Sequence, residues 1–222
     1  MSEQNTNSQL IAYLQQFVTV EKQEKIAQIV AGRTRHITIV LEELYQSHNA
    51  SAALRSAECF GLQDVHVVDT NRSFALSPSI AKGAAQWLNV HKHSSTLICF
   101  NTLKAAGYTI VGTSLHPTAS TIHELPLDSK IALVFGTEQH GLSDDAVKYA
   151  DAFITVPMVG FTQSLNVSVA VGICLYDLTA RLRTTSIAWQ LSIAEQQELT
   201  LAWLRKSLIH HTKLERHFFK QE

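Results

Sequence analysis

The chain has 222 residues, of which 45% are apolar and 17% are charged. That balance allows a buried core and excludes a disordered protein. Lys and Arg total 18 and Asp and Glu total 19, which excludes a histone-like basic protein and an acidic tail protein. The length suits one domain with helical additions.

The sequence also bounds the compartment. Residues 1–9 are polar and lack the pattern of a secretory signal. No apolar run approaches the roughly 20 residues of a membrane-spanning helix. The cysteines Cys59, Cys99 and Cys174 are widely spaced and form no CxxC pair, which predicts buried thiols in a reducing compartment. We therefore expect a cytoplasmic protein.

Helical and strand patterns follow one another along the chain. Apolar residues between Leu10 and Val18 predict a helix, and Thr19 and Gly32 mark the start and the end of a second one. Short apolar runs then alternate with helical patterns, which indicates a parallel sheet covered on both faces. The runs are residues 37–41, 65–69, 108–113, 131–136 and 153–157. A capping box at Ser192 begins the last helical part.

These elements predict a helical N-terminal arm at 1–36, an α/β domain at 37–183 and a helical C-terminal arm at 184–222. Charge separates in a similar way. Residues 41–180 carry a net charge of −5, while the forty residues before them carry +1 and the residues after them +3. Basic arms are where a polyanion such as RNA would bind, although basic side chains that only solvate helix faces give the same pattern.

Several familiar site patterns are missing from the sequence. Gly136 and Gly141 have the spacing of half a P-loop, but Leu142 stands where the phosphate-binding lysine is needed. No GxGxxG follows a strand, and there is no GxSxG. None of the 11 histidines lies in HExxH or Cys/His zinc spacing, so we expect no metal.

Two segments carry residues that could do chemistry at the carboxyl ends of parallel strands, where ligands collect. After the first strand, Asn49 is a good helix N-cap, and Arg55 is either a surface arginine or a fixed guanidinium. After the run at 131–136, a glycine-bounded loop contains Glu138, and Ser143 caps the next expected helix.

The third such segment, 156–170, leads into an apolar stretch whose pattern is ambiguous. Apolar residues alternate with small or polar ones from Leu165 onward, which is typical of a strand. The stretch nevertheless continues to Leu178 and ends in Arg181 and Arg183, as a buried helix would. Periodicity alone leaves both structures open.

The patterns N-x-x-A-x-x-R, F-G-x-E-x-x-G-L-S and P-M-x-G-x-x-x-S-L-N-V-S-x-A occur in this order. Together they resemble the three motifs of the SpoU/TrmH group of RNA 2′-O-ribose methyltransferases. Within it, the chain is most similar to the tRNA (guanosine-2′-O)-methyltransferases that act on guanosine 18 in the D-loop. The resemblance covers about residues 33–183. It implies a SPOUT fold, a mostly parallel α/β sheet with a C-terminal deep trefoil knot, and a helix at 164–183 packed partly against a second subunit.

The resemblance also implies a methyl donor, partners and site residues. The donor would be S-adenosyl-L-methionine, the substrate tRNA, and the protein a homodimer. The donor pocket would be lined by Thr113, Gly136, Val156, Met158 and Leu165. The catalytic residue would be Arg55, in a pocket ordered by Asn49, Glu138, Ser164 and Asn166. RNA contacts would come from Arg33, Arg35, His48, Arg181 and Arg183.

Three other functions were weighed against this one. The same methylation could act on rRNA, but the roughly 35 residues before the sheet are too few for an added RNA-binding domain, which favours tRNA. A non-catalytic RNA-binding protein on the same fold is disfavoured because Arg55, Glu138 and Asn166 are all present. A small-molecule α/β enzyme is disfavoured by the basic arms and the missing cofactor fingerprints.

Overall fold

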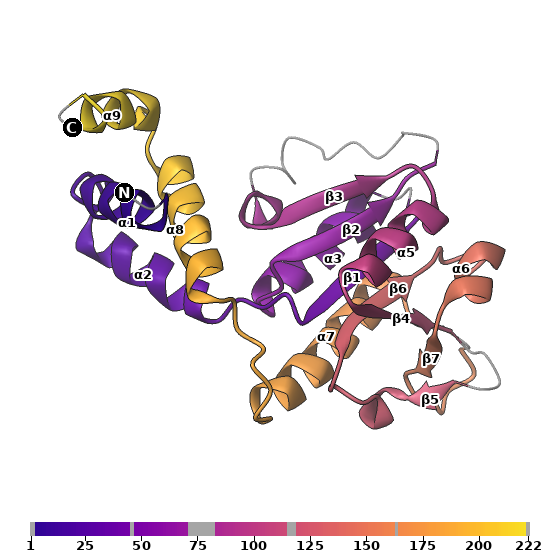
Figure 1. The fold of residues 1–222 in the computed structure, drawn as a ribbon. Coiled ribbons are helices and arrows are strands. Elements are labelled where there is room, and N and C mark those ends of the chain that lie inside the picture. Colours follow the sequence, from indigo (N-terminus) through magenta and orange to yellow (C-terminus); the bar gives the residue numbers. More distant parts are fainter. Residues whose placement is uncertain (1–2, 45–46, 71–82, 115–118, 163, 221–222) are drawn as a thin grey trace. The chain divides into compact units, whose positions relative to one another are not determined.

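The structure, a computed structural model, describes residues 3–44, 47–70, 83–114, 119–162 and 164–220. The chain divides into two compact units (Figure 1). One is helical and is formed by Met1–Arg33 together with Gln190–Glu222. The other, Thr34–Trp189, contains the sheet. None of the helices in the described ranges is long and apolar enough to cross a bilayer.

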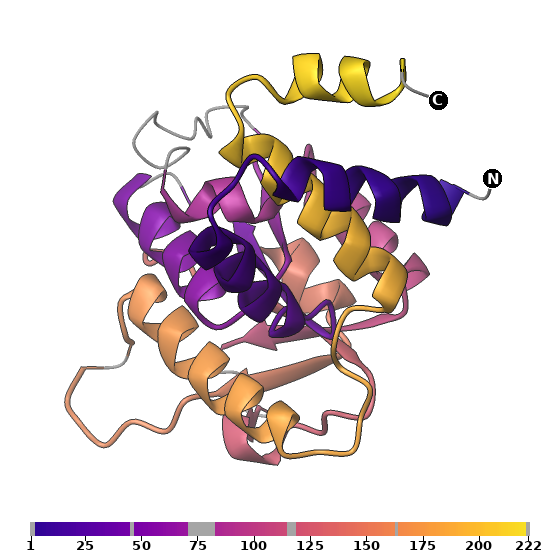
Figure 2. The same ribbon diagram turned by 90° about the vertical axis from the view of Figure 1, so that its left-hand side faces the viewer.

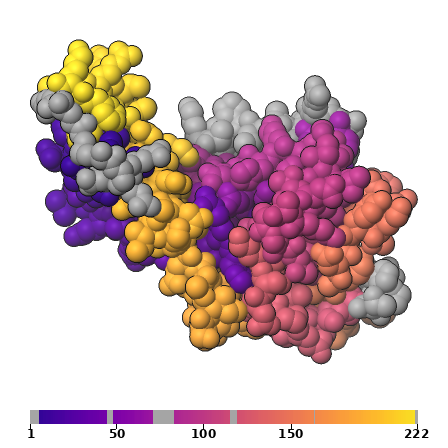
Figure 3. Space-filling model, viewed as in Figure 1, coloured from indigo at the N-terminus to yellow at the C-terminus, as the bar shows by residue number. Residues whose placement is uncertain are grey.

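The helical unit joins the two ends of the chain. Its helices are α1 (Glu3–Gln15), α2 (Val20–Ala31), α8 (Ile193–Ser207) and α9 (His211–Phe218). Figure 2 shows α8 beside α1 and α2, and Figure 3 shows the two chain ends packed into one body. Among the described residues, its buried apolar side chains are Leu10, Leu14, Ile26, Val30, Leu191, Leu199, Leu201, Trp203 and Leu204.

Two capping predictions in this unit are confirmed. The Thr19 side chain accepts a hydrogen bond from the backbone N–H of Lys22, and Gly32 caps the other end of α2. Ser192 and Glu195 form the expected capping box at the start of α8. Each bond satisfies a backbone group that a helix end leaves without a partner, which is why these residue types fix the boundaries.

The second unit is built on a seven-stranded, wholly parallel sheet in the order β3-β2-β1-β6-β4-β7-β5. The strands are β1 (Ile37–Glu42), β2 (Asp64–Val68), β3 (Asn89–His93), β4 (Tyr108–Thr113), β5 (Ser120–Thr121), β6 (Lys130–Phe135) and β7 (Ala152–Thr155). The helices are α3 (Ser47–Cys59), α5 (Thr96–Ala105), α6 (Asp144–Tyr149) and α7 (Val167–Arg183), with short 3-10 turns η1 (Ala84–Trp87) and η2 (Ile122–Glu124). The expected α/β class with a parallel sheet is confirmed.

Helices cover both faces of this sheet. One apolar cluster joins the side chains of β1, β2 and β6 that face α3 and α7, such as Ile39, Leu54 and Leu175. A second cluster joins the opposite face to α5 and α6, through residues such as Val40 and Phe100. Strands buried on both faces carry apolar residues at consecutive positions, which explains the continuous runs in the sequence.

The ambiguous stretch after β7 is a helix. α7 begins at Val167, with Asn166 as its N-cap, and ends at Arg183. The alternation with small side chains does not set its structure. The buried residues Val167, Val171, Cys174 and Leu178 recur at helical spacing, and apolar residues on the other face are exposed. The trefoil knot stays a prediction.

Two edge strands, β3 and β5, were not predicted from the sequence. β3 reads Asn-Val-His-Lys-His, and its side chains are partly or fully exposed, so it lacks the apolar run that marked the central strands. β5 has only two residues. Edge strands have one neighbour and often carry polar residues, and apolar patterning is therefore a weak signal for them.

Asp64 links the start of β2 to its neighbours. Its carboxylate accepts hydrogen bonds from Arg35 Nε at 2.7 Å, Asn89 Nδ2 at 2.9 Å and His91 Nε2 at 3.0 Å. Burial by itself raises the pKa of Asp64, but the bonds from His91, Asn89 and Arg35 outweigh it and lower the pKa to about 2. The charged form of the carboxylate therefore stabilises the folded chain.

We expect a measurable acid sensitivity from Asp64. Because its pKa is lowered on folding, its contribution is complete above the unfolded value near 3.8 and is lost as the pH falls toward about 2. The lost free energy of unfolding is about 2 kcal/mol. Urea unfolding of the wild type and of Asp64→Asn between about pH 5 and about pH 2.5 measures this term. The exposed Asp128→Asn is the control, and equal acid slopes in all three proteins would contradict the assignment.

Candidate active site

A pocket of about 350 Å³ lies at the carboxyl ends of β4, β6 and β7. These three strands are neighbours in the sheet. Thr113, Phe135 and Thr155, which each end one of these strands, line the pocket. The loops that follow β6 and β7 form its walls, and Val167, Ala170 and Cys174 of α7 line a further side. Ligands collect at this end of parallel sheets because the connecting loops open there.

The pocket brings together most of the residues expected at the site. All five residues expected to hold the methyl donor line it, namely Thr113, Gly136, Val156, Met158 and Leu165. Glu138 and Ser164 line it as well. These seven residues come from β4, the loop after β6 and the segment before α7, so only the folded sheet places them on one cavity.

Gly136 allows the loop after β6 to close on itself. Thr137 and Gly141 exchange backbone hydrogen bonds of 2.9 Å in both directions. A Cβ added at Gly136 would lie 2.0 Å from the carbonyl oxygen of Gly141, far inside van der Waals contact. Gly141 itself has a φ of +68°, in the left-handed region that glycine adopts without strain. The loop therefore requires glycine at both positions.

The far end of the same loop is held by Glu42, which sequence reasoning missed. This carboxylate, buried at the end of β1, accepts hydrogen bonds from the Ser143 backbone N–H at 2.9 Å and from its hydroxyl at 2.7 Å. The Thr96 hydroxyl donates to it as well. Ser143 also caps α6, as expected, by accepting from Ala146 N. A carboxylate at the end of an otherwise apolar strand was the signal that could have identified Glu42.

Three polar side chains from distant segments form a hydrogen-bonded chain beside the pocket. Asn166 Nδ2 donates to Asn49 Oδ1 at 3.2 Å, and Asn49 Nδ2 donates to Glu138 Oε1. Asn166 Oδ1 meanwhile accepts from Ser168 N at 2.9 Å, so the residue that caps α7 also orients Asn49. The chain ties α3, the loop after β6 and α7 together.

Asn49 has a different local role from the one expected. α3 begins at Ser47, so Asn49 lies inside its first turn and is not the N-cap. Its side chain is buried, and its two polar atoms form hydrogen bonds with Glu138 and Asn166. An asparagine near a helix start fits either role, and only the tertiary fold decides between them.

Arg55 lies on α3 with its side chain exposed, and it is not among the residues that line the pocket. No hydrogen bond or ion pair ties its guanidinium to the part of the chain that the structure describes. Arginines that hold a fold together usually bond to carboxylates or carbonyls. The guanidinium is thus left open to a molecule from outside.

Four of the five residues expected to contact RNA fall into two groups. Arg35 bonds to Asp64, and Arg181 bonds to Asp177 and to the carbonyls of Leu125 and Ile122. These two arginines therefore stabilise the α/β unit. His48 and Arg183 are exposed, although Arg183 also donates to a carbonyl, that of Phe60, at 2.9 Å.

Arg33 differs from the other four. It is fully buried in the helical unit, and its guanidinium carbon lies 5.0 Å from the centre of the Trp203 ring. A side chain shielded in this way cannot meet a phosphate without opening the unit. The structure gives Arg33 a packing role, and we propose no RNA contact for it.

Comparisons with known proteins agree with this geometry. The sequence profile of the SpoU rRNA Methylase family matches residues 36–176. A tRNA (guanosine(18)-2′-O)-methyltransferase of Borreliella burgdorferi is 40% identical over 205 residues, which are 92% of this chain and 94% of that protein.

Solved structures share the fold. The A. aeolicus TrmH/SpoU tRNA modifying enzyme matches with a TM-score of 0.75 and 26% identity, over 85% of this chain and 98% of that one. An AdoMet-bound rRNA methyltransferase from Sinorhizobium meliloti matches with a TM-score of 0.59 and 22% identity, over 72% of this chain and 61% of that one. The profile match over most of the chain, and the 40% identity over nearly all of it, show that this chain belongs to the SpoU rRNA Methylase family.

Proposed function

We propose that this protein transfers a methyl group from S-adenosylmethionine to the ribose 2′-hydroxyl of guanosine 18 in tRNA. One observation carries the proposal. The five residues expected to hold the donor line a single pocket, beside which Asn166, Asn49 and Glu138 form a hydrogen-bonded chain. The relative from Borreliella burgdorferi carries the name of this reaction, which supports tRNA over rRNA as the substrate.

The pocket suits the donor in size and in chemistry. Its volume of about 350 Å³ lies within the usual range for a small-ligand site. Leu142, Val156 and Leu165 offer apolar surface for a flat base, while the closed loop after Gly136 lets a ligand approach backbone groups. Glu138 supplies a negative charge near a ligand that carries a sulfonium.

The protein's own side chains have to stabilise the negative charge that develops on the substrate oxygen. When bound, S-adenosylmethionine supplies an electrophilic methyl group. A ribose hydroxyl is a very weak acid, so the site must stabilise the negative charge that develops as its proton leaves. Arg55 can donate paired hydrogen bonds to this oxygen and to a neighbouring phosphate. Since an arginine guanidinium normally stays protonated in proteins, we assign Arg55 charge stabilisation and not proton removal.

We also propose a homodimer that uses α7. Val169, Ile173 and Tyr176 are exposed and recur at i, i+4 and i+7, so they form one apolar stripe along this helix. Phe161, in the loop that leads to α7, is fully exposed. Contiguous apolar surface of this kind is typical of an interface between subunits. A cytoplasmic location fits a substrate that is tRNA.

The helical unit is the proposed tRNA-binding surface. α9 and the residues after it present exposed basic side chains, namely Lys213, Arg216, His217 and Lys220. Deleting residues 187–222 would not test tRNA binding alone. α8 packs on α1 and α2, so its loss would uncover their apolar faces and disrupt the unit. Point substitutions keep the unit intact.

We expect a triple variant of Lys213, Arg216 and Lys220 to alanine to bind tRNA at least tenfold more weakly while binding S-adenosylmethionine normally. The plot of log affinity against log salt should flatten by up to about 3. Filter binding across salt concentrations measures both quantities. The control is a triple alanine variant at Lys104, Lys130 and Lys148, three exposed lysines of the α/β unit. An equal loss in the control would place the RNA elsewhere.

The function itself is tested by incubating the protein with labelled S-adenosylmethionine and either bulk tRNA or rRNA, then mapping the modified ribose. We expect label in tRNA at guanosine 18 alone. Label confined to rRNA would support the alternative substrate. If no RNA is labelled under conditions in which the donor binds, the enzymatic proposal fails.

A further inference from the structure

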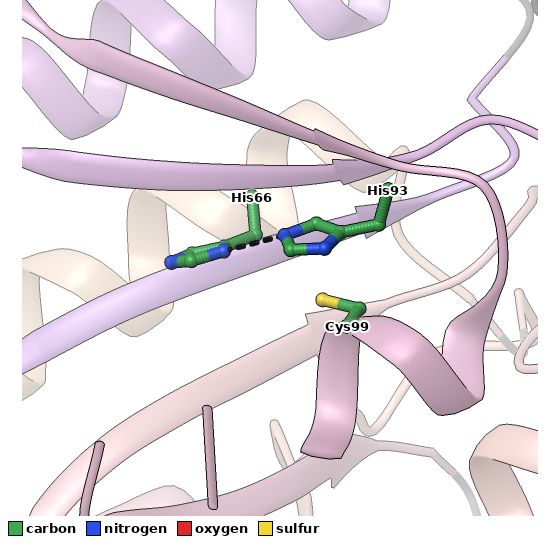
Figure 4. A group of neighbouring side chains, drawn as sticks. All are labelled: His66, His93 and Cys99. Carbon is green, nitrogen blue, oxygen red and sulfur yellow. Dashed lines mark hydrogen bonds between the residues drawn. The ribbon is translucent and has the colours of Figure 1, made fainter. Parts of the chain in front are cut away.

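A second group of chemically capable side chains lies outside the proposed active site. His66 of β2, His93 of β3 and Cys99 of α5 have ligand atoms that all lie within 4.8 Å of one another. Figure 4 shows the two imidazoles side by side, with the sulfur of Cys99 directed toward them. His66 and Cys99 are buried, and His93 is half-buried. None of the three residues lines the donor pocket.

The sheet register brings these residues together. His66 pairs with His91 across β2 and β3, so His93, two residues along, projects from the same face. That face packs against α5, which carries Cys99. The ligand-spacing rules applied to the sequence could not detect this cluster, because His66 and His93 are 27 residues apart.

The two imidazoles already direct one nitrogen each toward the other. His66 Nδ1 and His93 Nε2 are 2.9 Å apart, so one nitrogen donates a proton to the lone pair of the other. The ring of His66 lies nearly parallel to the rings of His91 and His93, with centroids 4.8 Å and 5.2 Å away. The hydrogen bond keeps one nitrogen of His66 and one of His93 facing each other.

A carboxylate also lies near the cluster. The buried carboxylate of Glu42 bonds to Thr96, in the first turn of the helix that carries Cys99. Burial first, and then the charge of Glu42, raise the pKa of the Cys99 thiol to about 12, so a thiophilic cation has to displace a firmly held proton from that sulfur.

We propose that His66, His93 and Cys99 form a binding site for a Zn²⁺ ion. Two imidazole nitrogens and one thiolate are the donors that Zn²⁺ prefers, whereas Mg²⁺ and Ca²⁺ require oxygen ligands. Three protein ligands leave a fourth tetrahedral position for water. Zinc bonds of about 2.0 Å to nitrogen and 2.3 Å to sulfur place ligand atoms about 3.5 Å apart. The two nitrogens, now 2.9 Å apart, therefore have to separate slightly, while the sulfur, which lies within 4.8 Å of both, has to move closer. Rotation of the His93 and Cys99 side chains can supply both movements.

The ion would tie α5 to β2 and β3, and its binding is measured on the full-length protein without RNA or methyl donor. We expect the chelator-treated wild type to bind one equivalent of Zn²⁺ in competition with a chromogenic chelator. Cobalt substitution should give the thiolate-to-metal charge-transfer band of a cysteine ligand. Mg²⁺ should not compete for the site.

Matched variants decide whether this cluster is the site. We expect Cys99→Ala and His93→Ala each to weaken Zn²⁺ binding at least about 100-fold. Cys59 of α3 is exposed, so the prediction that all three thiols are buried is wrong for this one. Cys59→Ala should change Zn²⁺ binding less than twofold. A circular dichroism spectrum in chelator checks that each variant is folded. Because His93 is only half-buried, His93→Ala should disturb the core least. The proposal is overturned if the wild type binds no Zn²⁺, if cobalt shows no thiolate band, or if a folded His93→Ala binds Zn²⁺ as the wild type does.

A thermal shift gives a second readout. Zn²⁺ should raise the melting temperature of the wild type and of Cys59→Ala, because a ligand that binds only the folded state stabilises it. The same addition should leave His93→Ala unchanged. An equal shift in all three proteins would point to the other histidines, and the proposed site would then be wrong.

Discussion

Replacing Arg55 with lysine should lower methyl transfer at least about 100-fold, and replacing it with alanine about 1000-fold. Lysine keeps the charge but loses the planar fork that bonds to an oxyanion and a phosphate together. Because Arg55 does not line the donor pocket, S-adenosylmethionine affinity should stay within about twofold of the wild type. Turnover with tRNA and equilibrium dialysis with the donor measure the two effects separately.

Arg183→Lys is the matched control for this prediction. Arg183 is also exposed and also follows an apolar helix stretch, but it donates a hydrogen bond to the Phe60 carbonyl, which lysine can still reach in part. Lysine also keeps the positive charge that an RNA contact at this position would use, so we expect the turnover of Arg183→Lys to change only a few-fold. Near wild-type turnover in Arg55→Lys would show that no specific guanidinium geometry is needed.

Substituting alanine for Gly136 should abolish measurable donor binding, with a loss of at least about 100-fold in affinity. The added methyl group would overlap the carbonyl carbon of Gly141, 2.3 Å away, as well as its oxygen. Backbone atoms cannot move aside as a flexible side chain can, so the loop has to open. Its opening displaces Glu138 and Leu142, which line the pocket.

Gly160→Ala is the control for the glycine prediction. Gly160 lies in the loop between β7 and α7, where the nearest heavy atom to an added Cβ is 4.0 Å away. Donor affinity should therefore hold in this variant. Isothermal titration with S-adenosylmethionine, together with a melting curve for each protein, separates a pocket defect from unfolding. A folded Gly136→Ala with normal donor affinity would refute the closed-loop account.

The central strands and the donor pocket could be predicted from the sequence, whereas the buried hydrogen bonds of Glu42 could not. Continuous apolar runs marked β1 and β6 because both faces of those strands are covered. The motif glycines and the residues before α7 indicated the pocket. No motif marked Glu42, because its role depends on hydrogen bonds from Ser143, which is 101 residues away.

The arginines show the same limit. Arg33 lies two residues before Arg35 and Arg55 stands alone in an apolar stretch, yet Arg33 packs on Trp203 and Arg55 is exposed. Exposure depends on which elements pack over a residue, and no local pattern carries that information. The zinc cluster proposed here has the same origin, because strand register and not sequence spacing assembles it.

The helical unit has a consequence for the order of events during synthesis. α1 and α2 leave the ribosome before α8, so the apolar face of Leu10, Leu14 and Ile26 stays uncovered until α8 follows. At elongation rates of about 5–20 residues per second, the intervening chain takes on the order of ten seconds to appear. During that interval the sheet can begin to form while the first two helices remain uncovered. Nascent chains stalled before α8 should therefore be the forms of this protein most prone to capture by chaperones.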